Sequence, residues 1–211
     1  MLELEDFVQV YKLKNSLKKA RTVLFDMDGT LLNSEPDHLK AVRRTLNHQN
    51  IIYPDSKLKK TTVGKTDHEV FQILSDEIPA LKQTPLVDLC KQKLKFFLEQ
   101  LNTESNVEMN PIIPNLLKQI KSQKIKIGLV TASSRKETMA LLKSKDILKY
   151  FDTVITSDEC YQSKPSPAPY FQAMRKLRSN QAECLILEDS TTGLMSATAT
   201  NAEVVKVSWY N

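Results

Sequence analysis

The sequence predicts an α/β protein in which a parallel β-sheet is interrupted by an inserted, entirely helical segment. Two observations lead to this prediction. After Pro111, short apolar runs alternate with helical patterns, which favours a parallel sheet covered by helices on both faces. Between Pro36 and about Leu101, by contrast, only helical patterns occur.

The first part of the chain contains one predicted strand between helical segments. Residues 1–20 form a predicted amphipathic helical extension, with Leu4, Phe7, Val8, Tyr11 and Leu17 near one stripe. Residues 22–25 are a short apolar run that ends at an Asp-Met-Asp-Gly loop, which predicts a buried strand. Within the insert we expect helices over 37–47, 67–74 and 86–101.

The second part of the chain alternates in type. We expect helices over 115–121, 135–145, 168–177 and 192–200, and strands over 124–130, 152–156, 184–187 and 203–207. The last of these strands leaves an edge of the sheet that needs cover, and we expect the N-terminal extension to supply part of it.

Composition narrows the class of protein. The chain has 211 residues, 41% of them hydrophobic, which is enough for one folded domain with an insertion. Its 30 Lys and Arg against 25 Asp and Glu give a net charge of +5. The basic residues are dispersed, and the alternating lysines of segments 57–60 and 91–95 are typical of solvated helix faces, so we expect no nucleic-acid partner.

Further features of the sequence bear on membrane association, cellular compartment and oligomeric state. No run approaches the ~20 apolar residues of a membrane span, so we expect no membrane partner. The three cysteines are far apart and form no C-x-x-C pair, which fits a reducing cytoplasm. We expect a monomer or a weak dimer.

Polar side chains gather where the predicted strands end. Each group alone has an ordinary structural explanation as a turn or a helix cap. Because the carboxyl ends of parallel strands meet at one edge of a sheet, we expect the groups to lie close together. They are Asp26 and Asp28, then Thr131, Ser133 and Ser134, then Lys164, and finally Glu188 and Asp189.

The chemistry of this set points to phosphoryl transfer. Crowded carboxylates repel one another unless a cation or protons neutralise them, and Mg²⁺ prefers such oxygen ligands together with substrate phosphate. Lys164 adds fixed positive charge, while hydroxyl and backbone N–H groups at 131–134 can hold phosphoryl oxygens. A metal, an ammonium group and an anion-binding loop are the parts that phosphoryl transfer needs.

The order of these motifs resembles the haloacid dehalogenase (HAD) superfamily of hydrolases. The matching motifs are DMDGT at 26–30, TASS at 131–134, Lys164, and EDS at 188–190. The segments NSEPDH at 33–38 and EDSTTG at 188–193 resemble its β-phosphoglucomutase-like and sugar-phosphatase branch. The resemblance implies a Rossmann-like core over 21–34 and 106–211, a helical cap over 35–105, and an extension over 1–20.

The resemblance also implies roles for individual residues. Asp26 would be the nucleophile that forms an aspartyl-phosphate, and Asp28 the general acid and base. Mg²⁺ would be held by Asp26, Glu188, Asp189 and the backbone carbonyl of Asp28. Thr131 would bind the transferring phosphoryl group, and Lys164 would stabilise the charge of the transition state.

Further positions are assigned to phosphate or substrate binding. His38 matches a histidine at the cap hinge, although a solvated helix histidine explains it equally well. Lys65 matches a cap loop that reaches the active site, although an ordinary lysine at a helix start explains it almost as well. The full set is Gly29, Thr30, Ala132, Ser133, His38 and Lys65.

The expected function is a Mg²⁺-dependent phosphatase acting on a small phosphorylated metabolite, either a sugar phosphate or a nucleotide-derived monophosphate. A β-phosphoglucomutase-like phosphomutase is the alternative, and Thr30 favours the phosphatase because mutases often carry a branched apolar residue there. A non-catalytic phospho-ligand binding protein is a third possibility, which the intact set of charged residues disfavours.

Overall fold

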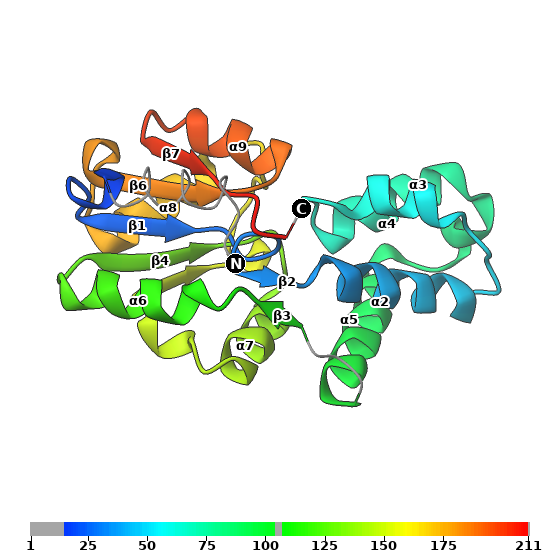
Figure 1. The fold of residues 1–211 in the computed structure, drawn as a ribbon. Helices are drawn as coiled ribbons and strands as arrows, with labels where there is room; N and C mark the ends of the chain where they lie inside the picture. The colour runs from blue at the N-terminus through cyan, green and yellow to red at the C-terminus, as the bar shows by residue number, and fades with distance from the viewer. Residues whose placement is uncertain (1–14, 104–106, 211) are drawn as a thin grey trace.

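A five-stranded parallel sheet forms the centre of the molecule (Figure 1). The computed structural model describes residues 15–103 and 107–210. The strand order is β5-β4-β1-β6-β7, and the α/β fold class predicted from the sequence is confirmed. The strands are β1 Thr22–Phe25, β4 Lys126–Val130, β5 Thr153–Ile155, β6 Cys184–Glu188 and β7 Glu203–Lys206.

Helices cover both faces of this sheet because alternate side chains of each strand point in opposite directions. On β1, Val23 and Phe25 pack in one apolar cluster with helices α6 and α7, whereas Leu24 packs in another with α8 and α9. These helices are α6 Ile112–Ser122, α7 Arg135–Ser144, α8 Ala168–Leu177 and α9 Thr191–Thr198. Short 3₁₀ turns lie between them: η2 Leu148–Tyr150, η3 Ser157–Glu159 and η4 Gln181–Glu183.

The inserted segment is helical throughout, as predicted, and lies to one side of the sheet (Figure 1). It has its own apolar cluster, which includes Val42, Leu58 and Phe71. The helix over 55–62 was not predicted as an element, because Leu58 is its one buried apolar residue and its periodicity is therefore weak. The insert consists of α2 Glu35–His48, α3 Asp55–Thr62, α4 Asp67–Glu77, η1 Pro79–Gln83 and α5 Leu86–Thr103.

A two-stranded antiparallel ribbon joins the insert to the rest of the molecule. Strand β2, Leu32–Asn33, precedes the inserted helices, and β3, Glu108–Met109, follows them. Leu32 pairs with Met109 and Asn33 with Glu108. Neither strand was predicted, since two residues are too few to show an alternating pattern. The ribbon therefore places side by side the two segments through which the chain enters and leaves the insert.

The predicted N-terminal extension falls largely outside the described residues. Within the described part, the Ser16 hydroxyl donates a hydrogen bond to the side chain of Glu203 on the edge strand β7. Leu17 is buried in the larger apolar cluster. The proposed cover of the sheet edge by residues 1–14 stays a prediction.

Candidate active site

Lys164 connects three neighbouring strands at the carboxyl edge of the sheet. Its ammonium nitrogen lies 2.6 Å from Asp26 Oδ1 and 2.6 Å from Glu188 Oε1, and it donates to the carbonyl of Val130 at 3.1 Å. The three side chains are buried. Because β4, β1 and β6 are adjacent, residues that are 138 positions apart along the chain meet here.

Three carboxylates gather on the same side of this edge. Ligand oxygens of Asp26, Glu188 and Asp189 all lie within 4.8 Å of one another. Burial raises the pKa of Asp26 well above its usual value; Lys164 opposes this, while the charges of Glu188 and Asp189 add to it. Burial likewise raises the pKa of Asp189 to about 6. A cluster of oxygen ligands that repel one another fits a hard divalent cation such as Mg²⁺.

Glu188 is held by donors on both of its oxygens. Oε1 accepts hydrogen bonds from Lys164 and, at 3.0 Å, from the Tyr170 hydroxyl. Oε2 accepts from the backbone N–H groups of Asp189 and Ser190 at 3.0 and 3.1 Å. Tyr170 was not identified from the sequence, because on the apolar face of α8 it resembles an ordinary core residue.

Asp28 lies in a different environment from Asp26. Its Oδ2 accepts hydrogen bonds from the hydroxyls of Thr131 at 3.0 Å and Ser133 at 2.8 Å, and Oδ1 accepts from Ser34. Burial raises the pKa of Asp28, but His38 and these hydroxyl donors outweigh it, and the net pKa lies well below the usual value. Its carboxylate is therefore turned toward hydroxyl donors rather than toward the acidic cluster.

Gly29 and Thr30 bring the first loop against Asp189. The Thr30 hydroxyl donates to Asp189 Oδ1 at 2.8 Å. Gly29 has φ +88°, and a Cβ there would lie 2.2 Å from Asp189 Oδ2. A glycine is required on both counts, because L-residues rarely adopt this conformation and no side chain has room.

His38 connects Asp28 with a buried lysine of the insert. Its Nε2 lies 3.3 Å from Asp28 Oδ1, and its Nδ1 lies 2.8 Å from Lys93 Nζ. An ammonium group has only donors, so Nδ1 accepts and the ring proton resides on Nε2, toward Asp28. The alternative of a solvated helix histidine is wrong, since the His38 side chain is 12% exposed and stacks on Phe97.

The prediction of a solvated lysine face over 91–95 is wrong for Lys93, whose side chain is 1% exposed. Lys93 Nζ lies 2.6 Å from Glu137 Oε1 on α7 and 2.8 Å from Asp67 Oδ1 on α4. One signal could have revealed it, because Lys93 lies four residues from both Leu89 and Phe97 on the buried face of α5.

Lys65 and Ala132 line a small cavity together with Asp26 and Asp28. Lys65 donates to the carbonyl of Lys60 at 3.4 Å. The position fits a contact with a bound ligand, and the role of Lys65 stays a prediction.

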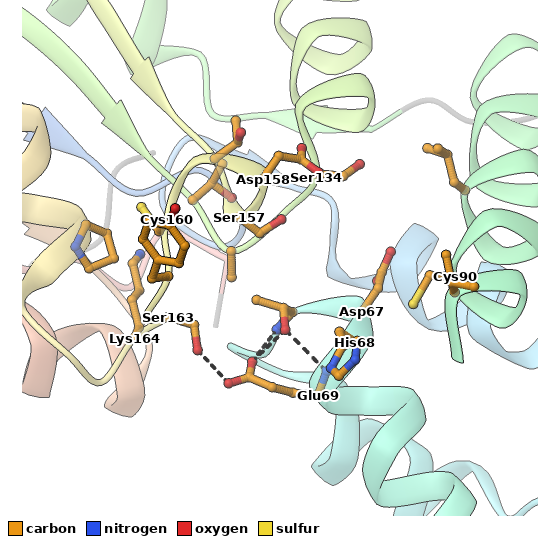
Figure 2. A pocket seen from close by; sticks show the side chains of 18 of the residues that line it. Asp67, His68, Glu69, Cys90, Ser134, Ser157, Asp158, Cys160, Ser163 and Lys164 are labelled. Atoms are coloured by element: carbon orange, nitrogen blue, oxygen red, sulfur yellow. Dashed lines mark hydrogen bonds between the residues drawn. The ribbon is translucent and has the colours of Figure 1, made fainter. Parts of the chain in front are cut away.

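A larger cavity of about 620 Å³ opens next to it, between helices α4 and α5 and the loops that follow β4 and β5. Figure 2 shows Asp67, His68 and Glu69 across this cavity from Ser134, Ser157 and Asp158. Lys164 also lines it, so the cavity reaches the carboxyl edge of the sheet.

Within residues 15–103 and 107–210, no helix has both the length and the apolar character to cross a membrane.

Comparisons with known proteins agree on one family. Residues 23–207 match the haloacid dehalogenase-like hydrolases. A phosphorylated carbohydrates phosphatase of Thermotoga maritima is 27% identical over 187 residues, 86% of this chain and 82% of that protein. Protein CbbY of Rhodobacter capsulatus is 30% identical over 193 residues (88% and 84%), and a phosphoglycolate phosphatase of Yersinia pseudotuberculosis is 27% identical over 195 residues (92% and 84%).

Solved structures share the fold. CbbY from Rhodobacter sphaeroides in complex with phosphate superposes with a TM-score of 0.80 at 23% identity, covering 88% of this chain and 84% of that one. A β-phosphoglucomutase from Clostridium difficile gives a TM-score of 0.79 at 23% identity, covering 88% and 83%.

The parallel sheet, the acidic edge and the helical insert define a class of α/β hydrolase with a cap. This chain belongs to the haloacid dehalogenase-like hydrolase family, in its sugar-phosphatase branch, and it is a phosphatase. The inserted helices α2–α5 are called the cap from here on.

Proposed function

We propose that this phosphatase hydrolyses a small phosphorylated metabolite through an aspartyl-phosphate on Asp26. The observation that supports it most is the position of Asp26, 2.6 Å from Lys164 Nζ and within the cluster with Glu188 and Asp189. Asp26 lines the small cavity, and the large cavity, which shares Ala132 and Lys164 with it, gives a substrate room nearby.

In the first step, an oxygen of Asp26 attacks phosphorus and the bond from phosphorus to the leaving oxygen breaks. Asp28 gives that oxygen its proton, and the approach of an anionic phosphoryl group favours the protonated form of Asp28. In the second step, water attacks phosphorus, Asp28 takes the proton, and the bond to Asp26 breaks to release inorganic phosphate. In both steps, the ammonium group of Lys164 compensates the negative charge of the transferring phosphoryl group.

The loop after β4 would hold the phosphoryl oxygens. Thr131 and Ser133 already direct their hydroxyls toward Asp28, and Ala132 lines the small cavity together with Asp26. These residues position the phosphoryl group between Asp26 and Asp28.

Mg²⁺ is part of the proposal. Asp26, Glu188, Asp189 and the backbone carbonyl of Asp28 would hold it, and the raised pKa values of Asp26 and Asp189 support a cation as their partner. When bound, Mg²⁺ neutralises the charge of the phosphoryl oxygens and of the carboxylates.

The names of relatives support a small phosphorylated metabolite as the substrate. Their names include a phosphatase of phosphorylated carbohydrates and phosphoglycolate phosphatases. We propose a sugar phosphate or a nucleotide-derived monophosphate for this chain, processed by a monomer or weak dimer in the cytoplasm. The division into a core (21–34 and 106–211) and a cap (35–105) belongs to the same proposal.

Hydrolysis of p-nitrophenyl phosphate tests the activity. We expect turnover with Mg²⁺, its loss with a chelator, and a decrease of at least about 10³-fold in kcat for Asp26→Asn, which removes the nucleophile. Circular dichroism of the variant controls for folding. Full activity in Asp26→Asn would overturn the nucleophile, and no metal-dependent turnover by the folded wild type would favour a binding protein.

The assay also separates the phosphatase from a phosphomutase. With sugar monophosphates as substrates, we expect steady release of inorganic phosphate. An isomerised sugar phosphate without phosphate release would favour the mutase.

A further inference from the structure

Three carboxylates line the wall of the large cavity, and one of them, Asp67, is compensated by buried Lys93 at 2.8 Å. Asp67 and Glu69 reach it from α4 of the cap, and Asp158 reaches it from the loop after β5 (Figure 2). Two lysines also line it. Lys164 is engaged by Asp26 and Glu188, and Lys91 is an exposed residue whose ammonium lies 3.3 Å from Asp88. No arginine is found among the described residues that line the cavity.

The helix N-terminus that faces the cavity from the cap is already occupied. Thr66 caps α4, and its backbone N–H donates to Glu69 Oε2 at 2.8 Å. The N–H of Glu69 donates in turn to Thr66 Oγ1 at 3.2 Å, which completes a capping box. A free helix N-terminus attracts anions, but here a carboxylate of the same helix fills that place.

On the opposite wall of the cavity, carboxylates also bind the backbone N–H groups at the N-terminus of α7. The backbone N–H of Arg135, the first residue of α7, donates to Asp158 Oδ2 at 2.5 Å. Ser134 forms a second capping box with Glu137, which takes up the N–H of Ser134 at 3.1 Å. The N-termini of α4 and α7 are thus both supplied with carboxylates before a substrate arrives.

Glu69 keeps its charge at neutral pH. The Ser163 hydroxyl donates to its Oε1, and Thr66 donates to its Oε2. Burial raises the pKa of Glu69, but these hydrogen bonds outweigh burial, and the net pKa is lowered. A second phosphate or a carboxylate placed beside Glu69 and Asp158 would meet negative charge. Among the described residues that line the cavity, the one lysine beyond Lys164 is Lys91, which is paired with Asp88 at the surface.

The same wall suits hydroxyl groups. The hydroxyls of Ser134, Ser157 and Ser163 already donate to Glu137, the carbonyl of Ser133 and Glu69, so their oxygens, like the carboxylates, can accept hydrogen bonds from the hydroxyl groups of a ligand. We propose that the cavity selects monophosphates whose remaining part is an uncharged, hydroxyl-bearing skeleton, and that it rejects substrates with a second phosphate or a carboxylate. This inference rests on the proposed phosphatase function and narrows its substrate class.

Matched substrate pairs test the selection. Glycerol 3-phosphate and 3-phosphoglycerate differ in whether the far carbon is a hydroxymethyl or a carboxylate group, and glucose 6-phosphate and glucose 1,6-bisphosphate differ by a second phosphate. We expect the uncharged member of each pair to have a kcat/KM at least about tenfold higher. Equal or higher values for the anionic members, with p-nitrophenyl phosphate hydrolysed normally, overturn the selection and leave the phosphatase function standing.

Variants that remove a negative charge test whether the carboxylates of the cavity wall cause this substrate preference. Glu69→Gln keeps a side chain that can complete the capping box, and Asp158→Asn keeps an acceptor. We expect each to narrow the ratio of kcat/KM between uncharged and anionic members by at least about threefold, because one repelling charge is lost. Asp76→Asn, on the exposed face of the same helix α4, is the matched control and should leave the ratio unchanged. If the wild type and the three variants have the same ratio of kcat/KM, the carboxylates of the wall do not cause the preference, and the inference is wrong.

Binding measurements separate the inference from turnover. Calorimetry of the Asp26→Asn variant with the same pairs should show tighter binding of the uncharged members even without hydrolysis. If that variant prefers the anionic members or binds neither, the inference is wrong. If the wild type hydrolyses no substrate while this binding preference holds, the phosphatase proposal fails on its own.

Discussion

Gly193 shows how closely the backbone approaches the charged groups of the site. It lies in α9, where glycine is ordinarily less favourable than alanine by ~1 kcal/mol. A Cβ at this position would lie 1.7 Å from Glu188 Oε1. Glu188 cannot move freely, because Lys164, Tyr170 and two backbone N–H groups hold it.

Gly193→Ala should therefore lower the melting temperature, against the gain that helix propensity alone would give. We expect a loss of about 1–3 kcal/mol, the usual range for overpacking a close-packed site. Differential scanning calorimetry measures it, with Thr198→Ala, at an exposed position of the same helix, as the control. A melting temperature that rises in Gly193→Ala would show that Glu188 is free to shift.

At the scale of elements, Lys93 joins four helices. It extends from α5, and its ammonium contacts His38 on α2, Asp67 on α4 and Glu137 on α7. The pair with Glu137 crosses from the cap to the core. Breaking a buried ion pair from one side leaves uncompensated charge and costs ~3–5 kcal/mol.

Lys93→Met should accordingly destabilise the protein by about 3–5 kcal/mol at neutral pH, measured by urea unfolding. Lys91→Met, at an exposed position of the same helix, should change the free energy of unfolding by less than about 0.5 kcal/mol. Equal, small effects of both substitutions would contradict the buried network.

The loss of unfolding free energy in Lys93→Met should depend on pH. In the wild type, burial raises the pKa of Glu137, but Lys93, His38 and the Ser134 hydroxyl together outweigh burial, so the net pKa is lowered and its contribution to stability is lost as pH falls below ~4.3, the unfolded value. Without Lys93, the main effect that opposes burial is lost, so the pKa of the carboxylate rises and protonation relieves the penalty. The difference in unfolding free energy between the two proteins should thus narrow between pH 7 and pH 4. A difference that widens would contradict this assignment.

At the scale of the whole molecule, the proposed Mg²⁺ site would couple metal binding to stability. Asp26, Glu188 and Asp189 come together only in the folded chain, so a cation that binds them stabilises the folded state. At 100 times its dissociation constant, Mg²⁺ should add ~2.7 kcal/mol. The expected rise in melting temperature is about 5–10 °C for a chain of this size.

Thermal shift assays with Mg²⁺ and with a chelator measure this rise. In Asp189→Asn the shift should be at least halved, because one charged ligand is lost. A shift of the same size in that variant would place the cation elsewhere.

Local patterns predicted most of the secondary structure. The alternation of apolar runs and helical patterns after Pro111 predicted the core strands, since buried strands and amphipathic helices are visible over a few residues. Elements with weak local signals escaped: α3 buries a single apolar residue, and β2 and β3 have two residues each. Their positions depend on contacts with other parts of the chain.

The sequence by itself determined the α/β class, the helical insertion and the acidic and hydroxyl groups at the strand ends, because motif spacing and strand ends follow from local chemistry. Only the tertiary structure decided that Lys93 is buried, that Tyr170 contacts Glu188, and that Glu69 and Asp158 face the same cavity. The spacing of Lys93 from Leu89 and Phe97 indicates a buried face of the helix, but the partners that compensate a buried charge come from distant elements, which a local pattern does not identify.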